Sequence, residues 1–99
     1  MTLSIQQLLA QPEGKTLEFK RDISSPKNLL KTLVAFANSA GGVLLVGVAD
    51  GGGKVLGVGA KPLDEEERLC NMIADSIEPR LVPNVELIAV NKKNVLAVE

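Results

Sequence analysis

Residues 38–53 of this 99-residue chain have the sequence NSAGGVLLVGVADGGG, and the other predicted elements can be arranged around them. The segment from Val43 to Val48 contains no polar side chain and no alternation of polar with apolar residues. A short apolar run bounded by glycines is typical of a strand that is buried on both faces. Asp50 follows this strand closely, where a sheet meets solvent and where functional residues of α/β sheets gather.

The segments upstream predict a short helix and a half-buried strand. Residues 4–10 combine a capping-box pattern with apolar residues at helical spacing. Residues 16–23 alternate between apolar and polar side chains, as in a strand with one buried face. Leu17 and Phe19 point towards the core in this interpretation, and the polar face carries Thr16, Glu18, Lys20 and Asp22.

A longer helix is expected between this strand and the buried one. Ser25 is a suitable N-cap, and Pro26 suits the first helical position. Apolar residues then recur with helical period on one side, while Lys27 and Lys31 lie on the opposite side. A glycine at 41 or 42 provides the left-handed turn that ends the helix.

Downstream of the buried strand, turn chemistry predicts a hairpin and then an amphipathic helix. The glycine-rich turn favours a return strand over residues 54–58. Asp64 is expected to cap the next helix, with Cys70 on the buried side as a small core residue. Two further strands, at 85–90 and 95–98, are joined by a polar turn.

These elements follow one another in the order α-β-α-β-β-α-β-β. We therefore expect an α/β fold of the mixed α+β kind, in which helices pack on a mixed sheet. The length fits a single domain over residues 1–99. Because the chain ends within or just after a strand, we expect it to be part of a longer protein.

The composition excludes several classes of function. The chain has no His, which removes Ser-His and Cys-His catalysis and His-ligated zinc. Its two aromatic residues, Phe19 and Phe36, disfavour recognition of single strands on several aromatic platforms. One cysteine cannot form an intrachain disulfide, and no signal-peptide pattern or membrane-length apolar run is present. We expect a cytoplasmic protein.

Charge is unevenly distributed, although the net charge is −1. Residues 1–61 carry seven Lys/Arg against four Asp/Glu, a balance of +3. Residues 62–99 carry four Lys/Arg against eight Asp/Glu, a balance of −4. Neither half is basic enough to predict tight binding of nucleic acid through phosphate charge alone.

Gly14-Lys15-Thr16 resembles the end of a phosphate-binding loop, but the pattern is incomplete. The first glycine of such a loop would fall on Leu9. The residues after Thr16 also predict a strand where that loop requires a helix. ATP hydrolysis is therefore not predicted.

Glu13, Glu18 and Asp50 form a candidate acidic site. If the strand at 16–23 lies beside the buried strand, the three carboxylates meet at one end of the sheet. Converging carboxylates raise one another's pKa values unless a divalent cation lies between them, so the trio is a candidate Mg²⁺ or Mn²⁺ site for phosphodiester cleavage. The alternative is that these carboxylates form surface ion pairs with Lys15, Lys20 and Lys54.

Four short segments form one wider pattern: EGKTLEFK at 13–20, AFANSAGG at 35–42, GVADGG at 47–52 and GV at 57–58. This pattern resembles the Schlafen AlbA-type domain, and the resemblance extends from about residue 12 to the end of the chain. It implies a mixed α/β fold related to the archaeal chromatin protein Alba, whose relatives bind DNA or RNA. In bacteria, domains of this family commonly open longer proteins described as transcriptional regulators or helicase-related proteins.

The resemblance also implies a site. In animal Schlafen members that cut transfer and ribosomal RNA, an E-x(4)-E pair and a later Asp form a metal-dependent active site. Glu13, Glu18 and Asp50 occupy the matching positions, and Glu18 and Asp50 are the implied ligands of Mg²⁺ or Mn²⁺. Those nucleases place two such lobes around an RNA groove, which implies a homodimer for a single lobe.

Three functional hypotheses follow from the residues and the resemblance. The first is a DNA-binding, or more broadly nucleic-acid-binding, module of a transcriptional regulator. Its predicted phosphate contacts are Lys15, Lys20, Arg21, Lys27, Lys31 and Lys54. The second is a metal-dependent endoribonuclease that uses the acidic trio. The third is a non-catalytic domain for dimerisation and assembly.

Overall fold

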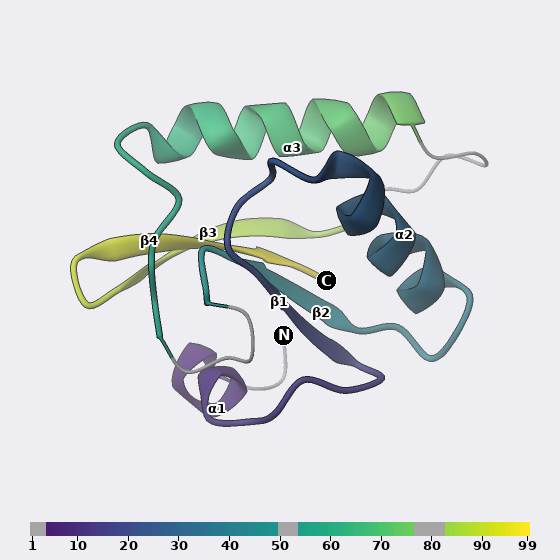
Figure 1. Cartoon of the computed structure of the whole chain (residues 1–99), viewed down its shortest axis with the longest axis horizontal. Coiled ribbons are helices and arrows are strands. Elements are labelled where there is room, and N and C mark those ends of the chain that lie inside the picture. Colours follow the sequence, from purple (N-terminus) through teal and green to yellow (C-terminus); the bar gives the residue numbers. More distant parts are fainter. Residues whose placement is uncertain (1–3, 50–53, 77–82) are drawn as a thin grey trace.

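The computed structural model describes residues 4–49, 54–76 and 83–99. Four strands form one mixed sheet in the order β1-β2-β4-β3, and three helices pack on it (Figure 1). The elements along the chain are α1 (Ile5–Leu9), β1 (Leu17–Lys20), α2 (Pro26–Ala37), β2 (Val43–Val46), α3 (Pro62–Ser76), β3 (Val85–Val90) and β4 (Lys93–Val98). The predicted mixed α/β architecture is confirmed. Within the described ranges, no helix has the length and apolar character needed to cross a membrane.

β2 is the interior strand that the sequence predicts. It pairs in parallel with β1 on one side and antiparallel with β4 on the other. Leu44, Leu45 and Val46 are at most 1% exposed, which agrees with an unbroken apolar run. The parallel pairing with β1 is possible because α2 provides the crossover between the two strands.

Helices cover the sheet on both faces (Figure 1). On one face, buried side chains of α2 and α3 pack against Leu44 and Val46. On the other face, α1 packs with Leu17, Phe19 and Leu45. Because side chains alternate along a strand, the intervening residues of β1 are directed to the face that carries α2 and α3.

β1 and β2 are both shorter than predicted. β1 ends at Lys20 because the chain turns at Asp22, whose Oδ1 accepts hydrogen bonds from the Ser24 backbone N–H at 2.9 Å and from Ser24 Oγ at 2.6 Å. Asp22 therefore belongs to a turn, and its predicted place on the polar face of the strand is wrong. β2 ends at Val46 because Gly47 takes a φ of +104°.

The return strand predicted after the glycine-rich turn is wrong. In the described part of this segment, pairing consists of a bridge between Val48 and Val55. Beyond it, the backbone N–H groups of Leu56 and Gly57 both donate to the Gly47 carbonyl oxygen, at 2.7 and 2.9 Å. Two donors on one acceptor do not continue a strand ladder. The observed order is therefore α-β-α-β-α-β-β.

α3 begins earlier and buries a narrower stripe than predicted. The helix begins at Pro62, so Asp64 lies within the first turn and is not the cap. Leu69 and Ile73 are buried as expected. Cys70 is exposed, and the prediction of a core cysteine is wrong.

The predicted capping box at the start of α1 and the predicted glycine turn at the end of α2 are both confirmed. Ser4 and Gln7 form the expected capping box, with Ser4 N–H donating to Gln7 Oε1 at 2.8 Å and Gln7 N–H donating to Ser4 Oγ at 3.2 Å. At the end of α2, Gly41 has a φ of +94° and donates its N–H to the Phe36 carbonyl oxygen at 3.0 Å. Glycine adopts this left-handed conformation without the steric cost that a Cβ would bring.

The last two strands form the predicted hairpin with a tighter turn. β4 begins at Lys93, so the turn consists of Asn91 and Lys92. Both turn residues have positive φ, at 49° and 65°. This is type I′ geometry, whose twist matches that of the strands it joins.

Candidate functional site

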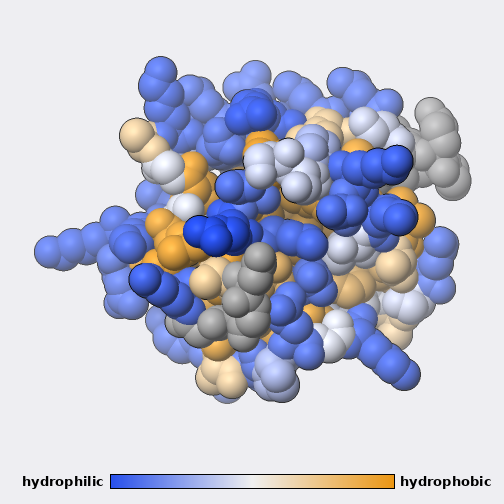
Figure 2. Space-filling model, viewed as in Figure 1, coloured by the Kyte–Doolittle hydropathy of each residue, from blue (hydrophilic) through white to orange (hydrophobic). Residues whose placement is uncertain are grey.

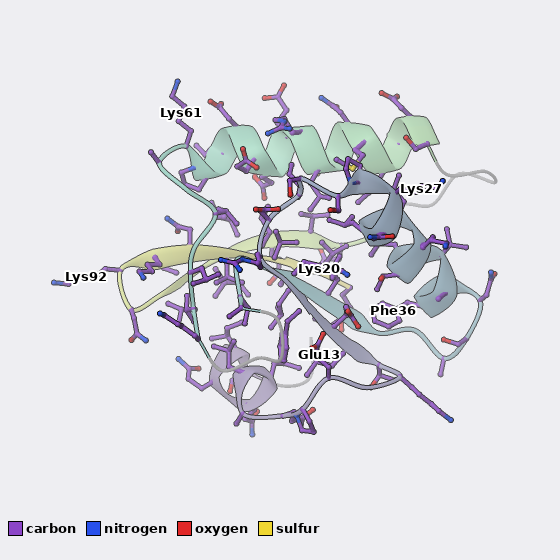
Figure 3. The ribbon with its side chains drawn as sticks, in the orientation of Figure 1. Glu13, Lys20, Lys27, Phe36, Lys61 and Lys92 are labelled. Carbon is purple, nitrogen blue, oxygen red and sulfur yellow. The ribbon has the colours of Figure 1, made fainter. Side chains whose placement is uncertain are left out.

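Glu13 and Glu18 lie next to one another at the outer edge of the sheet. Glu18 is on β1, and Glu13 reaches this strand from the preceding loop (Figure 3). Glu13 Oε2 accepts a hydrogen bond from the Phe19 backbone N–H at 3.1 Å. Lys20 Nζ lies 3.6 Å from Glu18 Oε1. The structure thus brings together two of the three predicted acidic residues and one of the predicted cations.

The pKa of Glu18 is raised above its ordinary value. Partial burial is the largest cause, followed by repulsion from the Glu13 carboxylate and a hydrogen bond between the two side chains. Lys20 acts in the opposite direction and lowers the pKa. Carboxylates that share a site favour the binding of a proton or a cation, because either one relieves their repulsion.

Asp50, the third member of the predicted trio, lies outside the described residues. The chain on either side of it is paired, because the Ala49 N–H donates to the Lys54 carbonyl oxygen at 2.9 Å and Val48 bridges Val55. Convergence of Asp50 with the other two carboxylates therefore stays a prediction.

The donors that the structure does describe are suited to a hard cation. Mg²⁺ is commonly held by one or two carboxylates, with water completing its shell, and Glu13 and Glu18 supply two such groups. Over the described ranges, no three Asp, Glu, Cys or His side chains are grouped closely enough to hold a metal. The assignment of Glu18 and Asp50 as metal ligands stays a prediction.

Four of the six predicted phosphate-contacting cations lie on β1, directly after it, or on α2. Lys20 and Arg21 lie at the carboxyl end of β1, and Lys27 lies on the first turn of α2 (Figure 3). Lys31 is exposed one turn further along the same helix. Two others lie elsewhere, before the start of β1 and beside the Val48–Val55 bridge: Lys15 and Lys54.

A concave surface of about 260 Å³, here termed the polar hollow, separates the end of β1 from the start of α2. Lys20 and Arg21 line it from the strand end, and Ser25 and Asn28 line it from the helix. The Ser25 side chain makes no capping hydrogen bond. The amino end of α2, which carries the positive end of the helix dipole, thus lies at a hollow whose wall has two cations and the Asp22 carboxylate.

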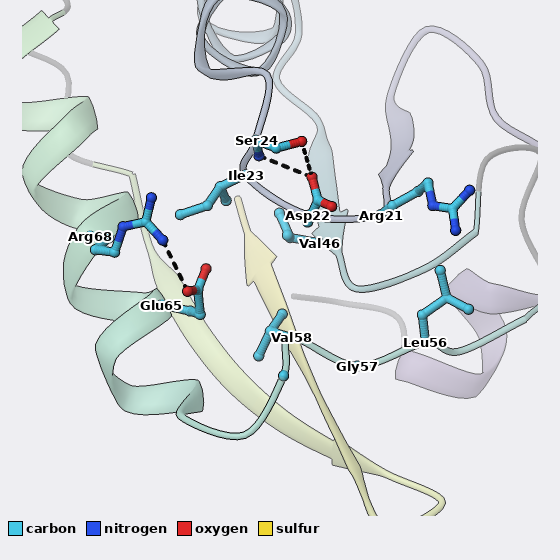
Figure 4. Close-up of a pocket in the computed structure, with 11 residues that line it drawn as sticks. Arg21, Asp22, Ile23, Ser24, Val46, Leu56, Gly57, Val58, Glu65 and Arg68 are labelled. Carbon is cyan, nitrogen blue, oxygen red and sulfur yellow. Dashed lines mark hydrogen bonds and ion pairs between the residues drawn. The ribbon is translucent and has the colours of Figure 1, made fainter.

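A second concave surface, of about 450 Å³ and here termed the amphipathic hollow, is shown in Figure 4. It adjoins the polar hollow, because the two have lining residues in common. Its apolar wall comes from four side chains: Ile23, Val46, Leu56 and Val58. Its charged rim includes Arg21 and also Arg68, whose Nη1 lies 3.1 Å from Glu65 Oε1.

Sequence reasoning missed Asp22, Glu65 and Arg68 as lining residues of these hollows. Local signals for them were present. Asp-x-Ser at 22–24 is typical of a side-chain-stabilised turn, and Glu65 and Arg68 are spaced for a pair on one helix face. Their meeting with the end of β1 depends on tertiary packing, which neither signal contains.

Hydrophilic residues cover most of the molecular face that Figure 2 shows. Hydrophobic residues appear there in small areas between them. This face therefore has the character of a solvated surface.

A family model described as Schlafen, AlbA_2 matches residues 13–99. The chain belongs to this family. The match begins at Glu13 and spans the Schlafen AlbA_2 pattern that contains Glu18 and Asp50. No curated protein matches the sequence significantly.

Two solved structures are similar to this Schlafen AlbA_2 domain. One is the N-terminal domain of a RecG-related protein from Nitrosomonas europaea, a candidate ATP-dependent DNA helicase, with 29% identity and a TM-score of 0.82. That match covers 98% of this chain and 72% of the other. The second is the DIP2311 protein from Corynebacterium diphtheriae, with 21% identity and a TM-score of 0.70. It covers 95% of this chain and 23% of the other, and it supports the fold alone.

Proposed function

We propose that this Schlafen AlbA_2 domain binds nucleic acid through the polar hollow and the exposed side of α2. The observation that carries the proposal is the adjacency of Lys20 and Arg21 to the amino end of α2 around one concave surface. Cations and a helix N-terminus both attract a phosphate, and their combination at one place favours a backbone phosphate of DNA or RNA. Lys27 and Lys31 extend the cationic surface along the helix.

The local hydrogen bonds leave Arg21 suited to this role. Asp22, the neighbour of Arg21, accepts two hydrogen bonds from Ser24. These bonds and, to a smaller extent, the charge of Arg21 lower the pKa of Asp22, so Arg21 shares this carboxylate with two other donors. Lys20 shares its charge with Glu18 at 3.6 Å. The expected contribution of Arg21 to phosphate binding therefore exceeds that of Lys20.

The comparisons supply independent support. The similar domain from Nitrosomonas europaea opens a protein described as related to a DNA helicase, a class of protein that handles nucleic acid. DNA is accordingly the first ligand to test, followed by RNA. We further propose that the domain belongs to a transcriptional regulator.

The test is fluorescence anisotropy with labelled duplex DNA, single-stranded DNA and an RNA hairpin over a series of salt concentrations. We expect binding that weakens with salt, and Arg21→Gln should lower affinity for all three ligands and reduce the salt slope by about one. Lys92→Gln, in the β3–β4 turn and at a residue that lines neither hollow, is the matched control and should bind as the wild type does (Figure 3). Absence of binding at low salt, or equal effects of the two variants, would refute the proposal.

The contact between Glu13 and Glu18 favours a second candidate function, metal-dependent cleavage of RNA. The two carboxylates would hold Mg²⁺ or Mn²⁺ together with Asp50, and the ion would activate water and stabilise charge on the phosphate. The raised pKa of Glu18 fits a pair that gains from a cation.

Cleavage of transfer RNA in the presence of Mn²⁺ tests this second candidate. Glu18→Gln and Asp50→Ala should each abolish cleavage, while Lys92→Gln should retain it. Equal cleavage by the wild type and both acidic-site variants would identify the activity as contamination.

A further inference from the structure

The polar and amphipathic hollows share a wall. Arg21, Asp22 and Ser24 line both of them, so a mainly polar hollow and a mainly apolar hollow lie side by side, and the two are together termed the groove. A nucleotide has the same division, since its phosphate is charged and its base has two flat faces of low polarity. We propose that the groove takes one nucleotide unit of single-stranded nucleic acid, with the base in the amphipathic hollow and the phosphate in the polar hollow.

The amphipathic hollow has the size and rigidity of a small-ligand site. Its volume of about 450 Å³ lies within the range of roughly 300 to 1,000 Å³ that is usual for such sites. Val46, on its wall, belongs to the interior strand and is 1% exposed. The Leu56 and Gly57 N–H groups are both held by the Gly47 carbonyl oxygen, which fixes the backbone on the opposite wall. A base therefore enters a hollow that is already formed.

Arginine supplies the stacking surface that aromatic residues cannot supply in this chain. Phe19 and Phe36 are 1% and 9% exposed, so their rings are in the core. Arg21 and Arg68 line the hollow, and Arg68 Nη1 donates a hydrogen bond to Glu65 Oε1 at 3.1 Å (Figure 4). Planar guanidinium groups stack on unpaired bases, while aliphatic side chains cover the remaining surface of the base.

The proposed position of the base in the amphipathic hollow favours one class of ligand, single-stranded nucleic acid. A base within a duplex is stacked between its neighbours and cannot enter a hollow without being extruded, which costs the energy of its pairing and stacking. An unpaired base enters without that cost. The groove therefore favours a single strand over a duplex of the same length. This inference rests on the proposed function, since it names the ligand class of the same surface.

The test compares three labelled oligonucleotides of equal length: a single strand, its duplex and an abasic single strand that keeps every phosphate. The single strand should bind about tenfold more tightly than the abasic strand, since stacking of one base supplies a difference of this order. Arg68→Gln, at an exposed side chain, removes one stacking surface and should reduce this difference without weakening the abasic strand.

The outcomes distinguish failure of the proposed base site from failure of the proposed phosphate binding. Equal affinity for the normal and abasic strands, or an equal loss on all three ligands in Arg68→Gln, overturns the base site and leaves phosphate binding intact. No binding of any strand at low salt overturns both. A loss confined to the base-bearing single strand supports the base site.

Discussion

The Glu13 carboxylate accepts a hydrogen bond from the backbone N–H of Phe19, at 3.1 Å, and so covers the outer edge of β1. The Thr16 carbonyl accepts from the Val43 N–H of β2, and the Lys20 carbonyl accepts from the N–H groups of Gly47 and Val48 just after β2. The backbone N–H and C=O groups of the alternate residues of β1 therefore point to the outer edge of the sheet. The Leu17 carbonyl on this edge accepts from the Gly14 N–H at 2.9 Å. The first acid of the E-x(4)-E pattern thus has a structural function besides any catalytic one, because it satisfies an edge strand.

Removal of the Glu13 acceptor should destabilise the protein. Glu13→Ala leaves the Phe19 N–H without its partner and should lower the free energy of unfolding by about 1 kcal/mol. Glu13→Gln keeps an acceptor and removes repulsion with Glu18, so its loss should be smaller. Urea unfolding of the two variants measures the difference. Equal losses would show that the edge hydrogen bond contributes nothing.

The raised pKa of Glu18 predicts a specific dependence of stability on pH. Because its pKa in the folded protein lies above the ordinary value of 4.5, stability that is fully present below that value is lost as pH rises through the folded-state pKa. Glu18→Gln does not titrate. Its stability relative to the wild type should therefore be more favourable at neutral pH than in acid, as measured by urea unfolding at several pH values. A relative stability that falls with rising pH would contradict this account.

The lowered pKa of Asp22 predicts the opposite dependence of stability on pH. Hydrogen bonds from Ser24 lower its pKa below the ordinary value of 3.8, so its stabilising contribution is present above that value and is lost as pH falls through the folded-state pKa. Asp22→Asn should therefore differ most from the wild type at neutral pH and least in strong acid. Carboxyl carbon NMR titration should give a midpoint below the ordinary value for Asp22 and above it for Glu18.

The two glycines of the AFANSAGG segment are required for different structural reasons. Gly41 requires a φ of +94°, while a Cβ on Gly42 would lie 2.7 Å from the Phe36 ring. Gly42→Ala should thus cost about 1 to 3 kcal/mol through overpacking. Phe36→Leu provides room, so the double variant should lose less stability than the sum of the single variants. Additive losses in thermal unfolding would exclude contact with the ring as the cause.

The homodimer implied by the two-lobed Schlafen nucleases has a direct solution test. We expect light scattering at increasing protein concentrations to show a mass that rises from monomer to dimer. A constant monomer mass over the whole range would contradict the dimer and the two-lobed groove. It would leave phosphate binding by a single domain unaffected.

Continuous patterns in the sequence predicted the centre of the fold well. The apolar run at Val43–Val48 contains the interior strand, Val43–Val46, and the helical stripe that includes Leu29 and Leu33 became the buried side of α2. Both patterns report burial directly, and burial is what selects these elements. The predicted strand also placed Glu13 and Glu18 near one another, because Glu13 lies in the short loop that leads directly into the strand of Glu18.

The wrong predictions have different physical causes. Gly47 and Gly57 adopt positive φ, and this breaks the ladder that turn chemistry predicted over 54–58. Cys70 follows Leu69 by one position, about 100° around the helix, so a narrow buried stripe leaves it exposed. The hollows were also beyond sequence reasoning, because they join residues of β1, the segment after β2 and α3.

The most direct measurement of the central claim is a ¹⁵N–¹H correlation NMR titration of the domain with a single-stranded oligonucleotide. The account predicts that the largest amide shift changes fall on residues 20–28, which line the end of β1 and the start of α2, with smaller changes at 56–59 and 68. Amides of the β3–β4 turn at Asn91 and Lys92 should not move. Changes centred on that turn, or no changes at low salt, would contradict the account.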